Sequence, residues 1–463
     1  MQLPQRRPTR TSILLLGAVL GLAGLLRAVG ASSGLPLPLL NPDETSIVPR
    51  AWAMATGGGL DPGWYDYPSL LFLVLAPTQL GLDEPSYGTA RVAAVCLGVL
   101  GVAAAWWLGR VAVGTLGAVA TAVVVAVATT HVAYSRMAVT DVLLTLGVTV
   151  SLALLVSGRL EWAGVAVGLA ASAKYPGAIL AVPLVVAGWG AWRRLGRAAA
   201  LAAGAFLLTS PFVVLHAGDA WDDFRRVQSL AQDGWLGFED DPATPLAFAL
   251  RLWESVGPIA LLAVVGVGIA LARRTHTDLV LVSFGAVYGL SLLTSSAHFD
   301  RYVLPLVPVC AVLASRTPPL AVATLVAAFV PLWWSVGDAR SLTGRDARLD
   351  AAAWIERNVP REERVAADSS TLPLREWDVL RLELPGPGRR FDPDRDLARL
   401  RARGIQWLIV GGSVADRVLD AASHYPGDAR FYREVARMQP AFATTDDPDR
   451  RSRPWLRVYR IYP

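Results

Sequence analysis

Charged residues are scarce in this sequence. They make up 17% of its 463 residues, whereas a soluble protein carries about 25%. The mean hydropathy is correspondingly positive, at +0.41. Residues 1–337 form apolar blocks separated by short polar connectors, while residues 338–463 are rich in Arg, Asp and Pro. This distribution excludes a wholly soluble protein and predicts a membrane domain followed by a water-exposed domain.

Cysteine is scarce as well. Cys96 and Cys310 both lie inside apolar blocks, so neither a disulfide framework nor a cysteine metal site is expected. The net charge is +5, but many of the arginines lie in short loops beside apolar segments, where they orient a membrane protein. The charge therefore does not indicate a nucleic-acid partner.

Lysine is nearly absent, because Lys174 is one lysine among 43 basic residues. Arginine thus serves the ordinary tasks of anchoring and orientation. The two side chains are not interchangeable, since lysine carries a compact point charge. A lysine kept at one membrane edge indicates a specific need for that charge; the alternative is a chance survivor.

Eleven apolar segments are candidates for membrane spans, for which about 20 residues are needed. They lie at residues 12–29, 89–109, 115–131, 138–157, 160–174, 176–192, 198–216, 248–272, 278–296, 301–315 and 319–337. The apolar segment 68–80 is too short and follows a proline, so we expect it to be juxtamembrane or re-entrant. For the first segment we expect a retained helix, and a cleaved signal peptide is the alternative.

The basic residues predict the orientation. Arg6, Arg7 and Arg10 precede the first span, which places the N-terminus in the cytoplasm of a multi-pass plasma-membrane protein. Alternation then puts the remaining arginine-rich loops inside. The large first loop, residues 30–88, and the acidic stretch 219–241 face outward. Eleven spans also make the C-terminal domain extracytoplasmic.

Four groups of polar residues, distant in sequence, meet this outer face. A charge that borders a span is costly and is by default a functional hypothesis. Each group also has a structural interpretation: solvated loop carboxylates, a charge at a helix start, or interfacial anchors. The groups are Asp43 with Glu44, Asp141, Lys174, and the turn His298, Asp300, Arg301 and Tyr302.

These residue types suit phosphate chemistry at the membrane surface. A carboxylate can act as a general base, and Lys or Arg can bind phosphate. Nucleotide sugars are not available outside the cytoplasm, so an activated sugar must be delivered on a lipid such as a polyprenyl phosphate. Cations would then stabilise the departing lipid phosphate. Two neighbouring carboxylates also permit a divalent cation without requiring one.

Several motifs resemble the GT-C membrane glycosyltransferases, the superfamily of protein O-mannosyltransferases and aminoarabinose lipid A transferases. The first outer loop is similar to the Asp-Glu loop of that superfamily, and two later turns are similar to its lysine turn and its Arg-Tyr-x-x-Pro turn. The segments 351–360, 404–410 and 425–433 resemble the extracellular domain of many prokaryotic members. The motifs are Asn41-Pro-Asp-Glu-Thr-Ser, Trp64-Tyr-Asp-Tyr67-Pro-Ser-Leu, Ala173-Lys174-Tyr-Pro-Gly, and His298-Phe-Asp-Arg301-Tyr302 with Pro308.

The resemblance implies a role for each matching residue. Asp43 becomes the catalytic carboxylate with Glu44 beside it, and Asp141 becomes a second acidic site residue. The residues expected to bind substrate or phosphate are Lys174, Arg301, Tyr302, His298 and Tyr67. Some relatives carry lysine where this chain has Tyr67, which shifts phosphate binding toward Lys174 and Arg301.

Residues 338–463 predict a small α/β domain. Helices are expected at 346–358 and 428–438, and strands at 364–367, 407–410 and 456–462. Since its sequence shows no nucleophile–base pair or metal cluster, we expect acceptor recognition or scaffolding.

The sequence therefore predicts an inverting glycosyltransferase with a polyprenyl-phosphate-linked sugar donor, the sugar being mannose or another hexose or pentose. The acceptor is a glycan, lipid or protein outside the cytoplasm, and membrane lipid surrounds the spans. The alternatives are a transporter or flippase for lipid-linked sugars and a catalytically inactive member that binds lipid. A transporter should show repeated halves and polar helices at mid-membrane, whereas here the polar residues gather at one face.

Overall fold

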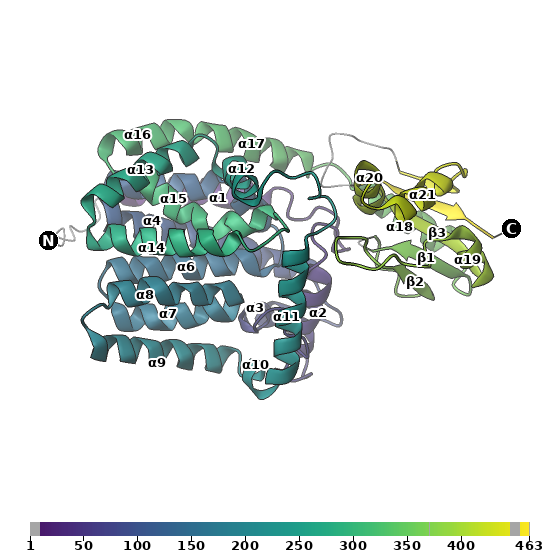
Figure 1. The fold of residues 1–463 in the computed structure, drawn as a ribbon, viewed down its shortest axis with the longest axis horizontal. Helices are drawn as coiled ribbons and strands as arrows, with labels where there is room; N and C mark the ends of the chain where they lie inside the picture. Colours follow the sequence, from purple (N-terminus) through teal and green to yellow (C-terminus); the bar gives the residue numbers. More distant parts are fainter. Residues whose placement is uncertain (1–9, 370, 445–453, 463) are drawn as a thin grey trace.

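The computed structural model describes residues 10–369, 371–444 and 454–462. A helical bundle forms one end of the molecule, and a small domain with a β-sheet forms the other (Figure 1). In the order of the chain the helices of the bundle are α1 (Arg10–Ala28), α2 (Glu44–Ala55), α3 (Leu70–Leu75), η1 (Ala76–Gln79), α4 (Tyr87–Val127), α5 (Thr129–Tyr134), α6 (Thr140–Val156), α7 (Leu160–Ala173), η2 (Tyr175–Leu180), α8 (Ala181–Ala187), α9 (Trp192–Thr209), α10 (Phe212–Leu215), α11 (Ala217–Asp233), α12 (Thr244–Val256), α13 (Ile259–Arg273), α14 (His276–Leu292), η3 (Asp300–Leu306), α15 (Val307–Ala314), α16 (Pro318–Ala327) and α17 (Phe329–Ser341).

The bundle has the apolar helices of a multi-pass membrane protein. Among the described residues, three helical segments are long and apolar enough to cross a membrane: α1, α4 and the continuous α16–α17 segment (Pro318–Ser341). If the bent pair α12 and α13 is counted as one span, there are four such segments. Shorter apolar helices lie at α6, α7, α14 and the segments Leu70–Gln79 and Tyr175–Ala187. The number of eleven spans therefore stays a prediction.

One predicted span is not a single straight helix. Residues 248–272 form two helices, α12 and α13, whose axes bend by 112°. Gly257 has a φ of 58°, in the left-handed region that favours glycine, and Pro258 follows it. Together they end α12 and start α13 in a new direction.

The predicted turn between the second and third spans is present as a break inside α4. Gly114 there has a φ of 87°, which a residue with a side chain rarely adopts. The third predicted span, 115–131, ends early because α4 stops at Val127. Buried Arg27 of α1 donates to the carbonyl oxygens of Val125 (2.9 Å) and Ala126 (2.9 Å) at this end. In an apolar bundle these carbonyl groups need such partners.

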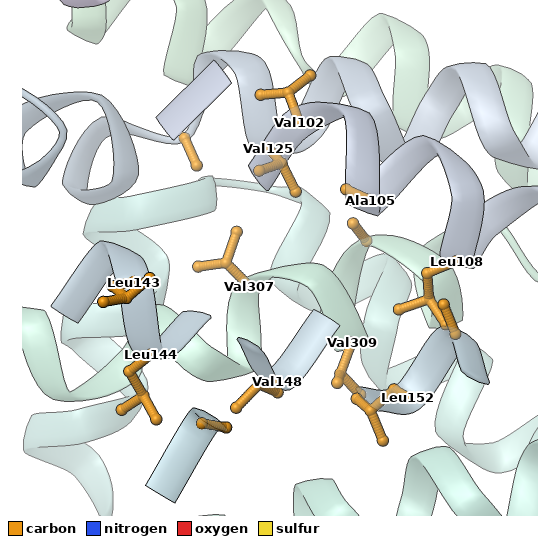
Figure 2. Close-up of a cluster of buried hydrophobic side chains, with 14 of the residues drawn as sticks. Val102, Ala105, Leu108, Val125, Leu143, Leu144, Val148, Leu152, Val307 and Val309 are labelled. Atoms are coloured by element: carbon orange, nitrogen blue, oxygen red, sulfur yellow. The ribbon is translucent and has the colours of Figure 1, made fainter. Parts of the chain in front are cut away.

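Branched aliphatic side chains fill the centre of the bundle. Val102 and Leu108 of α4, Leu144 and Leu152 of α6, and Val307 at the start of α15 interdigitate there (Figure 2). Helices α7 and α9 approach more closely, through small residues. A Cβ on Gly164 would lie 2.1 Å from the carbonyl oxygen of Ala198, so only glycine permits this packing.

The C-terminal domain is a mixed sheet covered by helices on both faces. Its strand order is β2-β1-β3-β5-β4, with β1, β2 and β3 parallel and β5 antiparallel to β3 and β4. The elements are α18 (Ala347–Asn358), β1 (Arg364–Asp368), β2 (Val379–Leu382), α19 (Leu397–Ala402), β3 (Ile405–Gly411), α20 (Gly412–Asp420), α21 (Pro426–Val435), β4 (Phe442–Ala443) and β5 (Leu456–Arg460). The small α/β domain, its three expected strands and its two expected helices are thus confirmed.

Alternation along the strands decides which helix covers which face. Val365 and Ala367 of β1 pack in one cluster with α18, whereas Ala366 packs in the other with α19, α20 and α21. Successive side chains of a strand point to opposite faces, which gives two cores. The predicted boundary at residue 338 falls within α17, and the domain follows directly at the end of that helix (Figure 1).

Candidate active site

Asp43 lies immediately before α2, in the long loop that follows α1. The side-chain oxygen of Asn41 accepts a hydrogen bond from the backbone N–H of Asp43 at 2.9 Å, which fixes the turn that enters the helix. The Asp43 side chain is 25% exposed. It is therefore accessible while its backbone is held in place.

Two side chains from distant parts of the chain bind the same carboxylate oxygen. The Tyr67 hydroxyl donates to Asp43 Oδ2 at 3.1 Å, and Arg301 Nη1 donates to it at 3.1 Å. Burial, and then the charge of Asp43, raise the pKa of the Tyr67 phenol well above its usual range. Tyr67 thus stays protonated and acts as a donor toward Asp43.

A second ion pair lies beside the ring of Tyr67. Lys174 Nζ is 2.6 Å from Asp141 Oδ1, and both side chains are largely buried, with 11% and 4% exposed. The same ammonium lies 5.4 Å from the ring centre of Tyr67 and 5.7 Å from that of Tyr302. Such distances allow cation–π attraction. The two ion pairs therefore form one site that shares Tyr67.

This site lies at the end of the bundle that meets the C-terminal domain. Asp43 precedes α2, Lys174 follows α7 and Arg301 is in η3; α2 and α11 mark the end of the bundle near the sheet domain (Figure 1). Residues from four distant segments meet at this end of the bundle. The cations of such a site can bind a phosphate, and the accessible carboxylate can accept a proton.

Glu44 has different partners from Asp43. Its carboxylate is fully buried and accepts from Arg91 Nε (2.9 Å) and Arg91 Nη2 (2.6 Å), and also from the backbone N–H of Ala138 at 3.0 Å. Both oxygens are therefore occupied. The predicted catalytic role of Glu44 finds no support in this geometry, which favours positioning: Glu44 ties the Asp43 loop to α4 and to the segment before α6.

We expect Glu44→Gln to destabilise the protein without changing its chemistry. The substitution leaves the Arg91 guanidinium buried without its counter-charge, which costs about 3–5 kcal/mol in the free energy of unfolding. Thermal unfolding of the purified protein measures the effect. Glu84→Gln, an exposed carboxylate of the same loop, is the control; equal melting temperatures for both variants would contradict the positioning role.

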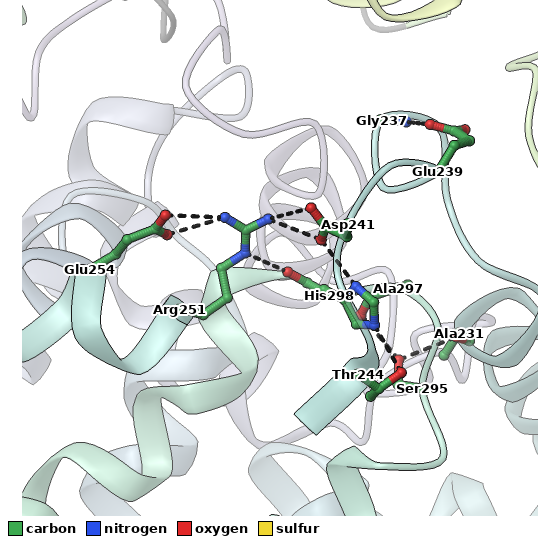
Figure 3. Close-up of polar contacts among 10 residues, drawn as sticks. All are labelled: Ala231, Gly237, Glu239, Asp241, Thr244, Arg251, Glu254, Ser295, Ala297 and His298. Carbon is green, nitrogen blue, oxygen red and sulfur yellow. Dashed lines mark hydrogen bonds and ion pairs between the residues drawn. The ribbon is translucent and has the colours of Figure 1, made fainter. Parts of the chain in front are cut away.

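His298 was expected to bind substrate or phosphate. Its side chain instead belongs to a neighbouring cluster of polar residues. Its ring lies 3.0 Å from Asp241 and 3.2 Å from Thr244 Oγ1, and its carbonyl oxygen accepts from Arg251 Nε at 3.0 Å (Figure 3). Arg251 also binds Asp241 and Glu254. This network ties the acidic stretch 219–241 to the turn that carries Arg301.

Sequence reasoning missed several participants. Tyr134 donates to Asp300 Oδ1 at 2.7 Å, and the same oxygen accepts the backbone N–H of Arg301 at 2.8 Å, so both residues orient that arginine. The sequence placed Asp300 in the polar turn with Arg301 but gave no sign of its partner Tyr134. Arg226 pairs with Asp66 and Asp223 beside Tyr65, and no local pattern indicated this pairing.

Asp43 and Glu44 do not form a shared cation site, because Arg301 and Arg91 bind them separately. Over the ranges that the structure describes, no group of three or more His, Cys, Asp or Glu is placed to hold a metal.

A family comparison fits this geometry. The model of glycosyltransferase family 87 matches residues 64–296, just over half of the chain. The chain belongs to glycosyltransferase family 87. None of the curated proteins matches its sequence.

Solved structures show the same fold at low identity. ArnT from Cupriavidus metallidurans, bound to undecaprenyl phosphate, is 15% identical with a TM-score of 0.61, and the match covers 98% of each chain. The oligosaccharyltransferase AglB from Archaeoglobus fulgidus, in complex with an inhibitory peptide and a dolichol-phosphate, is 11% identical with a TM-score of 0.63. That match covers 92% of this chain and 72% of AglB. The family 87 chain therefore shares the fold of these membrane proteins, and the family match together with this fold confirms the resemblance seen in the motifs.

Proposed function

We propose that this family 87 enzyme transfers a sugar from a polyprenyl-phosphate donor to an acceptor outside the cytoplasm. The observation that carries the proposal is a pair of cations at one end of an apolar bundle: Lys174 lies against the ring of Tyr67, and Arg301 binds the Asp43 carboxylate to which the Tyr67 hydroxyl donates. A lipid phosphate reaches this place from the bilayer while its sugar faces water. The lipid phosphates bound by ArnT and AglB support this donor class.

The proposed reaction is an inverting displacement. The acceptor hydroxyl oxygen forms a bond to the anomeric carbon of the sugar as the bond from that carbon to the phosphate oxygen breaks. Asp43 takes the hydroxyl proton, and the polyprenyl phosphate leaves with the electron pair. Lys174 and Arg301 stabilise the negative charge of the departing phosphate.

The ion pairs of the site suggest how donor binding prepares Asp43. Arg301 Nη1 binds Asp43 Oδ2, whereas its buried Nε has no hydrogen-bond partner among the described residues. A donor phosphate competes with Asp43 for this guanidinium. As Arg301 turns toward the phosphate, the carboxylate becomes free to accept a proton from the acceptor.

The proposal includes the expected topology. Eleven spans would place the N-terminus in the cytoplasm and both the site and the C-terminal domain on the outer face of the plasma membrane. The sugar would be mannose or another hexose or pentose, and the acceptor a glycan, lipid or protein.

The test uses membranes that contain the protein and their own acceptors, incubated with radiolabelled polyprenyl-phosphate hexoses and pentoses. We expect the label to move from the lipid extract into an acceptor fraction with at least one donor, and not with a nucleotide sugar. Membranes that lack the protein are the control. Label that stays on the lipid with every donor, or that only changes its side of the membrane, would overturn the proposal; the second result would indicate a flippase.

A further inference from the structure

A cavity of about 450 Å³ lies where the C-terminal domain meets the acidic stretch of the membrane domain. The loop 383–392 and the segment 424–428 form most of its wall, and Glu239 adds a wall from the other domain. Its volume falls in the range of small-molecule sites. Side chains that line it include Glu239, Glu383, Arg389, Phe391, His424 and Tyr425.

Contacts between the two domains hold this cavity in shape. The Tyr425 hydroxyl donates to Glu239 Oε1 at 2.5 Å, and Glu239 Oε2 accepts the backbone N–H of Gly237 at 2.7 Å (Figure 3). The guanidinium of Arg389 lies 4.5 Å from the ring centre of Trp235. The cavity is thus a built feature that needs both domains.

The lining has the chemistry of a carbohydrate site. Phe391 is 51% exposed and its ring lies over Gly427, where an added Cβ would be 2.9 Å from it. An exposed aromatic face of this kind can pack against the C–H face of a sugar ring. The side chains of Glu383, Arg390 and His424 are exposed around it and can hydrogen-bond to sugar hydroxyl groups.

The charges of the cavity favour a sugar over a phosphate-bearing ligand. Four carboxylates and two guanidinium groups line the cavity; Asp428 is paired with Arg395 at 3.1 Å, and Arg389 lies over Trp235. A negative ligand would meet repulsion from these carboxylates. Neutral or amino sugars meet acceptors for their hydroxyl or ammonium groups.

A continuous series of ring contacts joins this cavity to the active site. Trp235, which packs on Arg389, lies 5.7 Å from the ring of Phe299. The guanidinium of Arg301 lies 4.8 Å from the same Phe299 ring. These contacts link the wall of the cavity to Arg301, which binds Asp43.

We propose that this cavity binds a sugar unit of the acceptor and so positions a glycan acceptor toward Asp43. The inference rests on the glycosyltransferase function proposed above and adds the acceptor class. Phe391 supplies the stacking face, and Glu383 binds hydroxyl groups.

The test measures trisaccharide binding to the full-length protein in lipid nanodiscs without glycoside detergent, by saturation-transfer NMR. The probes are a neutral hexose, an amino-hexose and a pentose trisaccharide. We expect at least one to bind, and Phe391→Ala and Glu383→Gln each to weaken it by about tenfold, because the first removes the stacking face and the second removes the charge of a hydrogen-bond acceptor. Tyr462→Ala and Glu362→Gln alter an exposed aromatic residue and an exposed carboxylate of the same domain away from the cavity, and should leave binding unchanged.

Undecaprenyl phosphate binding, measured on the same samples, keeps the two proposals separate. We expect both cavity variants to bind it as the unchanged protein does. Lipid phosphate binding without any trisaccharide binding, or equal trisaccharide affinity in cavity and control variants, overturns the acceptor site alone. Failure to bind the lipid phosphate counts against the proposed donor instead.

Discussion

Asp43→Asn is expected to lower the rate of sugar transfer by about 10²–10⁴-fold, the usual contribution of a general base. Asparagine has nearly the same shape and still offers an oxygen to the Tyr67 hydroxyl, which lies 3.1 Å from Asp43 Oδ2. It cannot take a proton from the acceptor. The measurement is the initial rate of label transfer from the polyprenyl-phosphate sugar at saturating donor.

Two controls separate loss of chemistry from loss of structure. Asp83→Asn changes an exposed carboxylate of the same region between α1 and α4 and should keep full activity. Asp43→Asn itself should keep its membrane insertion, its gel-filtration profile and its binding of undecaprenyl phosphate. Transfer at an undiminished rate by Asp43→Asn would remove this residue from the role of base.

Removal of the charge of Lys174 is expected to have the second large effect. Lys174→Gln should lower kcat/KM for the donor by about 10²–10³-fold, as the loss of one group that stabilises developing negative charge does. The same change leaves Asp141 buried without its partner, because the two side chains form an ion pair at 2.6 Å. This costs about 3–5 kcal/mol of stability, so the single variant alone cannot distinguish a binding role from a structural one.

The double variant Lys174→Gln with Asp141→Asn resolves this ambiguity. With both charges replaced by amides, the buried site is neutral again, and we expect thermal stability to return toward that of the unchanged protein. Activity should not return, since the phosphate still lacks the ammonium. Lys174→Arg keeps a positive charge but not its compact form, and should recover part of the activity. Full activity in the double variant would show that Lys174 serves only to neutralise Asp141.

Local sequence patterns were sufficient to predict many of the helices and strands. Hydropathy predicted the α6, α7 and α14 segments closely, because a helix in an apolar environment must be apolar over its length. Alternation in Leu456–Arg460 predicted β5 for a similar reason, since one face of a strand meets the core. The break at Gly257 and the early end of α4 escaped prediction. They depend on backbone angles and on Arg27, which reaches carbonyl groups about one hundred residues away in sequence.

For the candidate site, the sequence predicted which charged residues share one face of the membrane domain, because few charges border the spans and the alternation of basic loops sorts them by side. It singled out Lys174 by composition alone. Only the tertiary structure decided which of these residues act together. Glu44 is adjacent to Asp43 in sequence, yet it binds Arg91, whereas Arg301 lies 258 positions from Asp43 and binds it directly. Pairing of this kind depends on how helices pack, and no short stretch of sequence encodes it. The cavity beside Glu239 has the same origin, since one of its walls belongs to each domain.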